Sequence, residues 1–174
     1  MRLLFEKEAV KRATDSVTRS SDFIAKKVAG LKRKSIPEVA VLAKMTKNDL
    51  QKFKVDKINW CEAGTNDVLD VGLSFSNGQS DQGGTYDCDK SFTLPSDLGK
   101  IETVFTNNQC WIYEIRLYNS SGTIIKTLGR PNSKFGPGRV ETFTIANNER
   151  LLGFEAHHNG LSVFGLTWLK WSPP

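Results

Sequence analysis

The 174-residue sequence contains only two histidines and three cysteines, which limits the metal and redox chemistry that it can support. His157 and His158 are adjacent, so they would project to opposite sides of an extended chain and could not share one metal ion. Cys61, Cys88 and Cys110 have neither CxxC spacing nor a regular disulfide framework. We therefore expect three reduced thiols, no metal site and no cofactor.

Long apolar runs are also missing. No segment approaches the roughly 18 consecutive apolar residues of a membrane span, and the first residues lack the apolar region of a secretory signal. A mitochondrial presequence stays open because Arg2, Lys11 and Arg12 are basic, although Glu6 and Glu8 argue against it. We expect an intracellular protein, located in the cytoplasm or on the cytoskeleton.

The sequence shows no residue pattern for catalysis. Ser162 and His157 could be combined with a distant carboxylate, but no nucleophile-elbow sequence surrounds the serine. Asp81-Gln-Gly-Gly84 lacks the alternating ligands of a calcium loop, and no helical pattern follows it as in a phosphate-binding loop. The sequence therefore predicts a protein that is not an enzyme.

The first 57 residues lack tryptophan, tyrosine and cysteine, and Gly30 is their only glycine. They carry 15 Lys and Arg against 7 Asp and Glu, a net charge of +8, whereas residues 58–174 carry 9 against 12, a net charge of −3. Such a shift in composition predicts a basic N-terminal arm over residues 1–57 and a core-forming domain over residues 58–174.

Apolar residues at helical spacing predict that the arm is mostly helical. One stripe runs through residues 3–17 and a second through residues 24–31. Ser35-Ile-Pro-Glu38 has the form of a capping box that would open a short helix, and Thr46-Lys-Asn-Asp49 would cap another. Because the stripes are narrow, these helices need the second domain or a partner to cover them.

A basic cluster lies at the expected end of the second helix, where the helix dipole favours cations. The cluster comprises Lys26, Lys27, Lys32, Arg33 and Lys34. It is either a solvated helix face or a binding site for the acidic protein surface of a larger assembly, such as a microtubule-like filament. Nucleic acid is the weaker partner, because Phe5, Phe23 and Phe53 are spaced for helix packing rather than for base stacking.

The second domain is a succession of short, alternating apolar runs separated by turns. The clearest run is 69–75, which ends at Asn77-Gly78, and the longest stretch is 151–171, which turns at 157–160. We also expect residues 55–60 to enter the sheet as a strand that buries Trp60. These patterns predict an all-β sandwich, barrel or prism.

The order of several motifs resembles that of jacalin-type lectins over about residues 58–171. Gly153-Phe154 followed by 161–166 is similar to the closing hairpin of that family, and 111–117 is similar to its strand ending Arg-Ser-Leu-x-Phe. Phe135-Gly-Pro137 resembles its Tyr-Gly-Pro segment. The resemblance implies a β-prism of three antiparallel sheets.

The resemblance also implies a sugar site, formed by a glycine-x-x-x-aspartate loop before the last strand. Here the aspartate position falls on Ser162, which lacks the charge and the second acceptor oxygen, so the inherited site is degenerate. One hypothesis is therefore a non-enzymatic assembly module that docks through the basic arm. The alternative is a carbohydrate-binding lectin with a remodelled ligand loop, for which the candidate residues are His157, His158, Asn159, Gly160, Leu161, Ser162, Asn107, Asn108 and Trp111.

Overall fold

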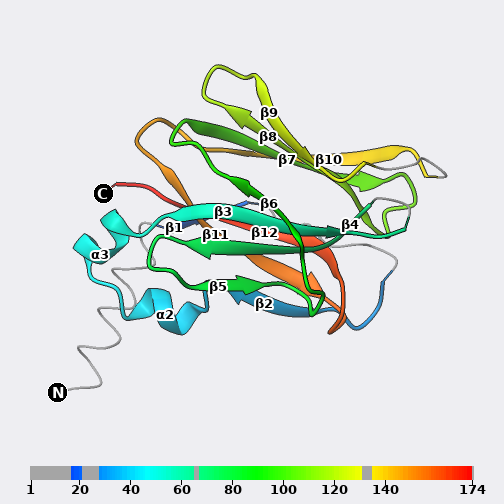
Figure 1. Cartoon of the computed structure of the whole chain (residues 1–174), viewed down its shortest axis with the longest axis horizontal. Helices are drawn as coiled ribbons and strands as arrows, with labels where there is room; N and C mark the ends of the chain where they lie inside the picture. Colours follow the sequence, from blue (N-terminus) through cyan, green and yellow to red (C-terminus); the bar gives the residue numbers. More distant parts are fainter. Residues whose placement is uncertain (1–16, 21–27, 65–66, 131–134, 174) are drawn as a thin grey trace.

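The computed structural model describes residues 17–20, 28–64, 67–130 and 135–173, and these ranges form an all-β fold with two short helices (Figure 1). The elements in chain order are β1 (Val17–Arg19), β2 (Lys32–Ile36), α2 (Val39–Ala43), α3 (Lys47–Lys52), β3 (Val55–Glu62), β4 (Val68–Phe75), β5 (Ser80–Gln82), β6 (Lys90–Thr93), β7 (Leu98–Thr106), β8 (Ile112–Asn119), β9 (Ile124–Leu128), β10 (Pro137–Thr144), β11 (Arg150–His158) and β12 (Val163–Trp171). Neither helix in these ranges is long and apolar enough to cross a membrane.

The closing stretch forms the predicted hairpin. β11 and β12 pair antiparallel from Arg150 opposite Trp171 to His158 opposite Val163, and nearly every residue of both strands is buried. β1 adds to β12 and β2 adds to β11, which gives a four-stranded sheet in the order β1-β12-β11-β2.

The other strands form two further sheets. β5, β4, β3 and β6 are neighbours in one, and β10, β7, β8 and β9 are neighbours in the other. A single registered pair, Val68 of β4 opposite Ile112 of β8, connects them, so they divide into two four-stranded sheets that meet at one corner. The fold is therefore a β-prism of three antiparallel sheets, as the resemblance implied.

The three sheets share one core. Ile58 of β3, Leu117 of β8 and Phe154 of β11 are fully buried. The ring of Trp168 on β12 meets Phe154 edge-on with centroids 5.4 Å apart, and its indole N–H donates to Thr103 Oγ1 of β7 at 3.0 Å. Trp60 is buried on β3, which confirms that the chain enters the sheet at residues 55–60.

The predicted helix over residues 32–34 is wrong, because this segment is strand β2. β2 supplies hydrogen-bond partners to the backbone of β11, which would otherwise be an open sheet edge, and this pairing overrides the local helical pattern. The approach is close enough that a Cβ on Gly153 would lie 1.9 Å from the carbonyl oxygen of Ile36. Val17–Arg19, at the end of the first predicted stripe, is likewise strand.

Within the described part of residues 1–57, helix occurs only in α2 and α3. The capping box of α3 is confirmed, since Thr46 Oγ1 accepts the Asp49 N–H and Asp49 Oδ2 accepts the Thr46 N–H. The short helix predicted after residues 35–38 is confirmed as α2, but its capping box is wrong, because Ser35 belongs to β2 and Glu38 makes no side-chain cap. The other predicted helical turns, with Lys26 and Lys27, lie outside the described residues. The domain boundary at residue 57 stays a prediction.

The expectation of three reduced thiols is wrong. Cys61 of β3 and Cys88 form a disulfide, with Cα atoms 4.7 Å apart and a sequence separation of 27, while Cys110 is free. The pairing of Trp60 with Lys90 between β3 and β6 brings the two cysteines together, and their spacing in sequence gives no sign of it. The intracellular location stays a prediction.

Candidate functional site

The β11–β12 loop, residues 159–162, is held by its own polar groups. Asn159 Oδ1 accepts the N–H groups of Leu161 and Ser162, each at 2.9 Å. The Gly160 N–H donates to His158 Nδ1 at 3.0 Å. The side chain of Leu161 at the tip is 57% exposed. The loop is therefore preorganised and presents an apolar tip with polar backbone around it.

A second segment, residues 83–86 between β5 and β6, lies directly against this loop. The Thr85 N–H donates to the Leu161 carbonyl at 3.0 Å. A Cβ on Gly84 would lie 2.0 Å from the same carbonyl oxygen, so only glycine permits this approach. Gly84 is therefore required for the close packing of these two loops.

Asp70 of β4 positions the 83–86 segment and was missed by the sequence analysis. Its Oδ1 accepts the N–H groups of Gly84 at 2.7 Å and Val71 at 2.8 Å, and its Oδ2 accepts the Tyr86 N–H at 3.3 Å. Burial raises the pKa of Asp70, although these N–H donors and Lys34 act in the opposite direction. The available signal was a carboxylate within an otherwise apolar strand, Val68-Leu-Asp-Val71.

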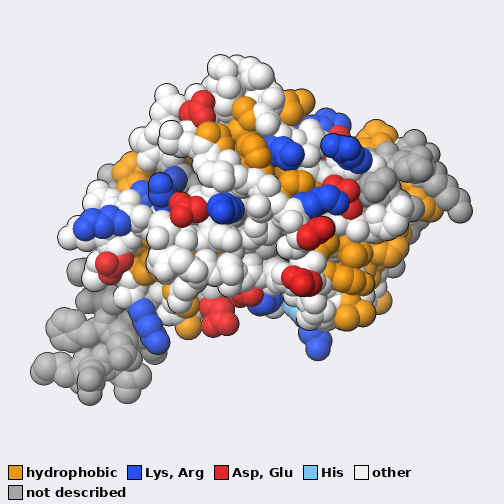
Figure 2. All heavy atoms as spheres, viewed as in Figure 1, with side chains coloured by type: hydrophobic (Ala, Val, Ile, Leu, Met, Phe, Trp, Pro, Cys, Tyr) orange, Lys and Arg blue, Asp and Glu red, His pale blue; other side chains and the backbone are white. Residues whose placement is uncertain are grey.

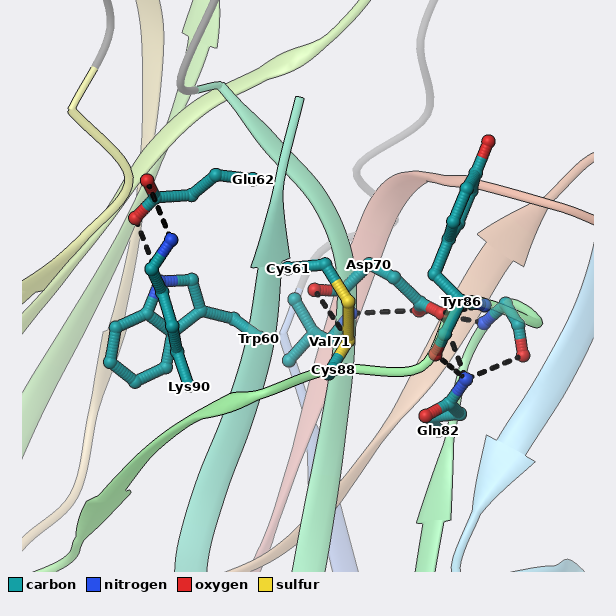
Figure 3. Close-up of a disulfide and its surroundings, with 10 residues drawn as sticks. Trp60, Cys61, Glu62, Asp70, Val71, Gln82, Tyr86, Cys88 and Lys90 are labelled. Carbon is teal, nitrogen blue, oxygen red and sulfur yellow. Dashed lines mark hydrogen bonds and ion pairs between the residues drawn. A yellow bond between two sulfur atoms is a disulfide. The ribbon is translucent and has the colours of Figure 1, made fainter. Parts of the chain in front are cut away.

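The Cys61–Cys88 disulfide anchors the same segment from its other end. Figure 3 shows the disulfide beside β3, with Asp70, Gln82 and Tyr86 on one side of it and Trp60, Glu62 and Lys90 on the other. Tyr86, just before Cys88, leaves 38% of its surface exposed. The carboxylate and the disulfide thus fix a short segment that carries an exposed aromatic ring.

Trp111, which precedes β8, stands at the same end of the prism. Its ring packs on Phe164 of β12 with centroids 5.3 Å apart, and 39% of its surface remains exposed. Phe164 lies two residues beyond Ser162, so the indole is close in the chain fold to the β11–β12 loop. We refer to loop 159–162, segment 83–86 and Trp111 together as the loop end. Figure 2 shows hydrophobic side chains gathered at this end, on the right of the view.

The two predicted asparagines beside Trp111 have different environments. Asn108 Oδ1 accepts the Thr106 hydroxyl at 2.5 Å and the Cys110 N–H at 3.1 Å, so it holds its own turn. Asn107 donates its backbone N–H to Gly136, and its side chain is exposed. Asn107 is therefore the more accessible polar group next to the indole.

The two histidines also have different environments. His157 is buried, and its Nε2 lies 3.1 Å from Thr167 Oγ1, so it faces the sheet rather than the solvent. His158 is half-buried, and burial lowers its pKa, assisted by Lys34 and Lys32. A neutral His158 can accept the Gly160 N–H at Nδ1 and so helps to hold the loop. Ser162, at the position of the family's aspartate, is buried.

Two of the three described members of the basic cluster form ion pairs within the molecule. Arg33 lies 3.3 Å from Glu155, and Lys34 contacts Asp81 Oδ1 and the Gln82 carbonyl oxygen at 2.8 Å each. Lys32 is exposed. These contacts attach β2 to β11 and β5. No three His, Cys, Asp or Glu side chains among the described residues converge as a metal site would require.

No protein-family model matches the sequence, and no curated protein matches it. Its fold is nevertheless similar to solved lectins. A prostate-specific WGA16 glycoprotein lectin aligns with 90% of this chain and 100% of its own at a TM-score of 0.59 and 9% identity. The Calystegia sepium agglutinin aligns with 90% of this chain and 97% of its own, at a TM-score of 0.55 and 14% identity. A Calsepa lectin solved in complex with a bisected glycan aligns with 90% of this chain and 97% of its own, at a TM-score of 0.50 and 15% identity. This chain has the β-prism fold of jacalin-type lectins.

Proposed function

We propose that this protein is a non-enzymatic carbohydrate-binding protein whose ligand contacts the loop end. The observation that carries the proposal is the exposed indole of Trp111, held on Phe164 beside a loop whose backbone is already fixed. An exposed apolar patch rimmed by polar groups is typical of a ligand-binding surface. Similarity to solved lectins in fold supports the same reading.

The chemistry of the loop end suits a saccharide. Sugar rings present an apolar C–H face, which an aromatic ring with one free face can cover. Their hydroxyls need neutral donors and acceptors, which the exposed Asn107 side chain and the polar backbone of loop 159–162 can provide. Because Ser162 is buried and uncharged, no carboxylate at this position grips two hydroxyls. We therefore expect dissociation constants on the order of 1 mM for a monosaccharide and tighter binding for larger glycans.

A glycan array of the full chain, followed by calorimetry on its best ligand, tests this proposal. Trp111→Ala should weaken binding roughly tenfold or more, because it removes the stacking face. Ile124→Ala on β9 is a matched control, since Ile124 is also an exposed apolar residue, at 51%. An array without saturable binding, or an equal loss in both variants, would contradict the proposal.

Docking onto an acidic partner through the basic arm stays a second hypothesis with less support. Arg33 and Lys34 already have acidic partners within the molecule. Deleting residues 1–57 is a poor test because it removes β2 from its sheet. Replacing Lys26, Lys27 and Lys32 together by glutamate keeps that strand, and unchanged pull-down of partners by this variant would count against docking.

A further inference from the structure

A cleft separate from the loop end opens between β3, β6 and the β9 strand of the neighbouring sheet. Its volume is about 500 Å³, within the usual range for small-molecule sites of roughly 300–1,000 Å³. Trp60 and Glu62 of β3, Lys90 of β6, Lys126 of β9 and Arg130 line it, together with the hydroxyl-bearing Ser91 and Thr127. Three cations therefore surround a single carboxylate.

That carboxylate is already satisfied. Glu62 Oε1 accepts the Trp60 indole N–H at 3.0 Å, and Glu62 Oε2 pairs with Lys90 Nζ at 3.1 Å, as Figure 3 shows. Burial raises the pKa of Glu62, but the combined effect of Trp60, Lys90 and Arg130 lowers it by more. The net shift of the pKa is therefore downward, and the carboxylate is ionised at neutral pH. One cation of the cleft is thereby neutralised and two are left.

The two remaining cations have no carboxylate partner among the described residues. Lys126 Nζ stands over the rings of Trp60 and Phe92, 5.4 Å and 5.7 Å from their centroids. Arg130 at the rim acts on Glu62 only through longer-range attraction. A lined cleft with two unneutralised cations and two hydroxyl groups offers charge-assisted donors to an anion.

We infer that this cleft binds the oxyanion group of an acidic saccharide, a sulfate ester or a carboxylate on a sugar ring. The volume accommodates about one sugar residue, the two free cations match one oxyanion, and Ser91 and Thr127 can donate to or accept from the neighbouring hydroxyls. The inference goes beyond the proposed function, because it gives the prism a second site of different chemistry that does not involve the loop end.

The experiment is a calorimetric titration of the full chain with a heparin-derived sulfated disaccharide, its desulfated counterpart and inorganic sulfate. We expect the sulfated disaccharide to bind and to weaken as salt is added. The desulfated sugar should bind at least roughly tenfold more weakly, because it lacks the charge-assisted bonds. Inorganic sulfate bound as tightly as the disaccharide would overturn the assignment to a saccharide.

Substitutions separate this cleft from general attraction to a basic protein. Lys126→Gln and Arg130→Gln should each weaken binding roughly fivefold or more, whereas Lys44→Gln, an equal loss of charge at an exposed site near α2, should leave it unchanged. An equal effect of all three would overturn the inference. Trp111→Ala distinguishes the two sites, because loss of neutral glycans with retention of the sulfated sugar is expected only if both exist.

A direct readout comes from the indole N–H signals in NMR spectra. The Trp60 N–H donates to Glu62 inside the cleft, so its signal should shift on titration with the sulfated disaccharide. The Trp168 N–H, which donates to Thr103 in the core, should not move. A binding isotherm without any change at Trp60 would place the saccharide elsewhere and overturn the inference.

Discussion

Replacing Asp70 by alanine should loosen the loop end selectively. The carboxylate accepts two short hydrogen bonds, from Gly84 at 2.7 Å and Val71 at 2.8 Å. A hydrogen bond to a charged group contributes roughly 1.5–3 kcal/mol, so the loss of both would cost about 3–6 kcal/mol. Removing a buried charge offsets part of this cost, as the raised pKa of Asp70 indicates. We expect a net loss of about 3 kcal/mol of unfolding free energy, or roughly 6–12 °C in Tm.

Amide hydrogen exchange gives the local part of this prediction. The Gly84 N–H loses its acceptor, and the Thr85 N–H, which donates to Leu161, loses the support of its neighbour. Both amides should exchange faster than those of the core strands, and glycan binding should fall with them. Asp87→Ala is a matched control, since this carboxylate is exposed and immediately follows the 83–86 segment. An Asp70→Ala protein that melts like the parent and protects Gly84 equally would refute the reasoning.

Three further predictions concern protons and the disulfide. Burial and the lysines of β2 lower the pKa of His158 below 6.5, so the contribution of neutral His158 to the loop is present above pH 6.5 and is lost as pH falls through the lowered pKa. Glycan affinity should fall over the same pH range. In the His158→Asn variant, affinity should not change over this range. The hydrogen bond from Lys170 lowers the pKa of Glu149 to about 2. After allowing for solvent screening, this pair contributes about 1 kcal/mol to the free energy of unfolding above pH 4.5, and the contribution is lost as pH falls through 2. Urea titrations at several pH values should show a smaller loss of stability in acid for Glu149→Gln than for the parent. Replacing Cys61 and Cys88 by serine should cost about 3.5 kcal/mol in denaturant unfolding, as expected for opening a loop of this length, and reductant should have no further effect on the variant.

Secondary structure was predicted correctly where the pattern that specifies an element lies within that element. The closing hairpin alternates apolar residues on both strands, so its existence and its turn could be read directly. The capping box of Thr46 and Asp49 is equally local, and it was confirmed. The β-prism itself depended on the order of several such segments along the chain, compared with a known family.

β2 could not be predicted in the same way. Its residues, Lys-Arg-Lys-Ser-Ile, carry three cations and have no apolar alternation. What specifies the strand is the edge of β11 and the acidic groups Glu155 and Asp81. Glu155 is 122 positions from Arg33 and Asp81 is 47 positions from Lys34 in sequence, and they become neighbours only in the fold. A basic run that looks like a surface for a partner thus acts partly as an internal attachment.

At the loop end, the sequence could predict the positions of loops but not the burial of individual side chains. The resemblance assigned Leu161 to the turn of the closing hairpin, and the structure has it between β11 and β12, while Trp111 immediately precedes β8. A role of either residue in ligand binding stays a prediction. The resemblance could not show that His157 and Ser162 are buried, since that depends on how the β11–β12 hairpin packs against its neighbours.

Neither the role of Asp70 nor the cleft could be predicted from sequence patterns, because each depends on contacts between residues far apart in the chain. Asp70 acts on a segment more than ten residues away, and the cleft draws Trp60, Lys90 and Lys126 from three strands. A buried or half-buried carboxylate lies on each side of the Cys61–Cys88 disulfide: Asp70 accepts backbone N–H groups of the 83–86 segment, and Glu62 accepts the Trp60 indole N–H of its own strand and pairs with Lys90 of β6. Asp70 accepts backbone N–H groups, whereas Glu62 pairs with only one of the three cations near it and so leaves the cleft with a positive charge. The chemistry of each surface therefore follows from what its carboxylate has already bound.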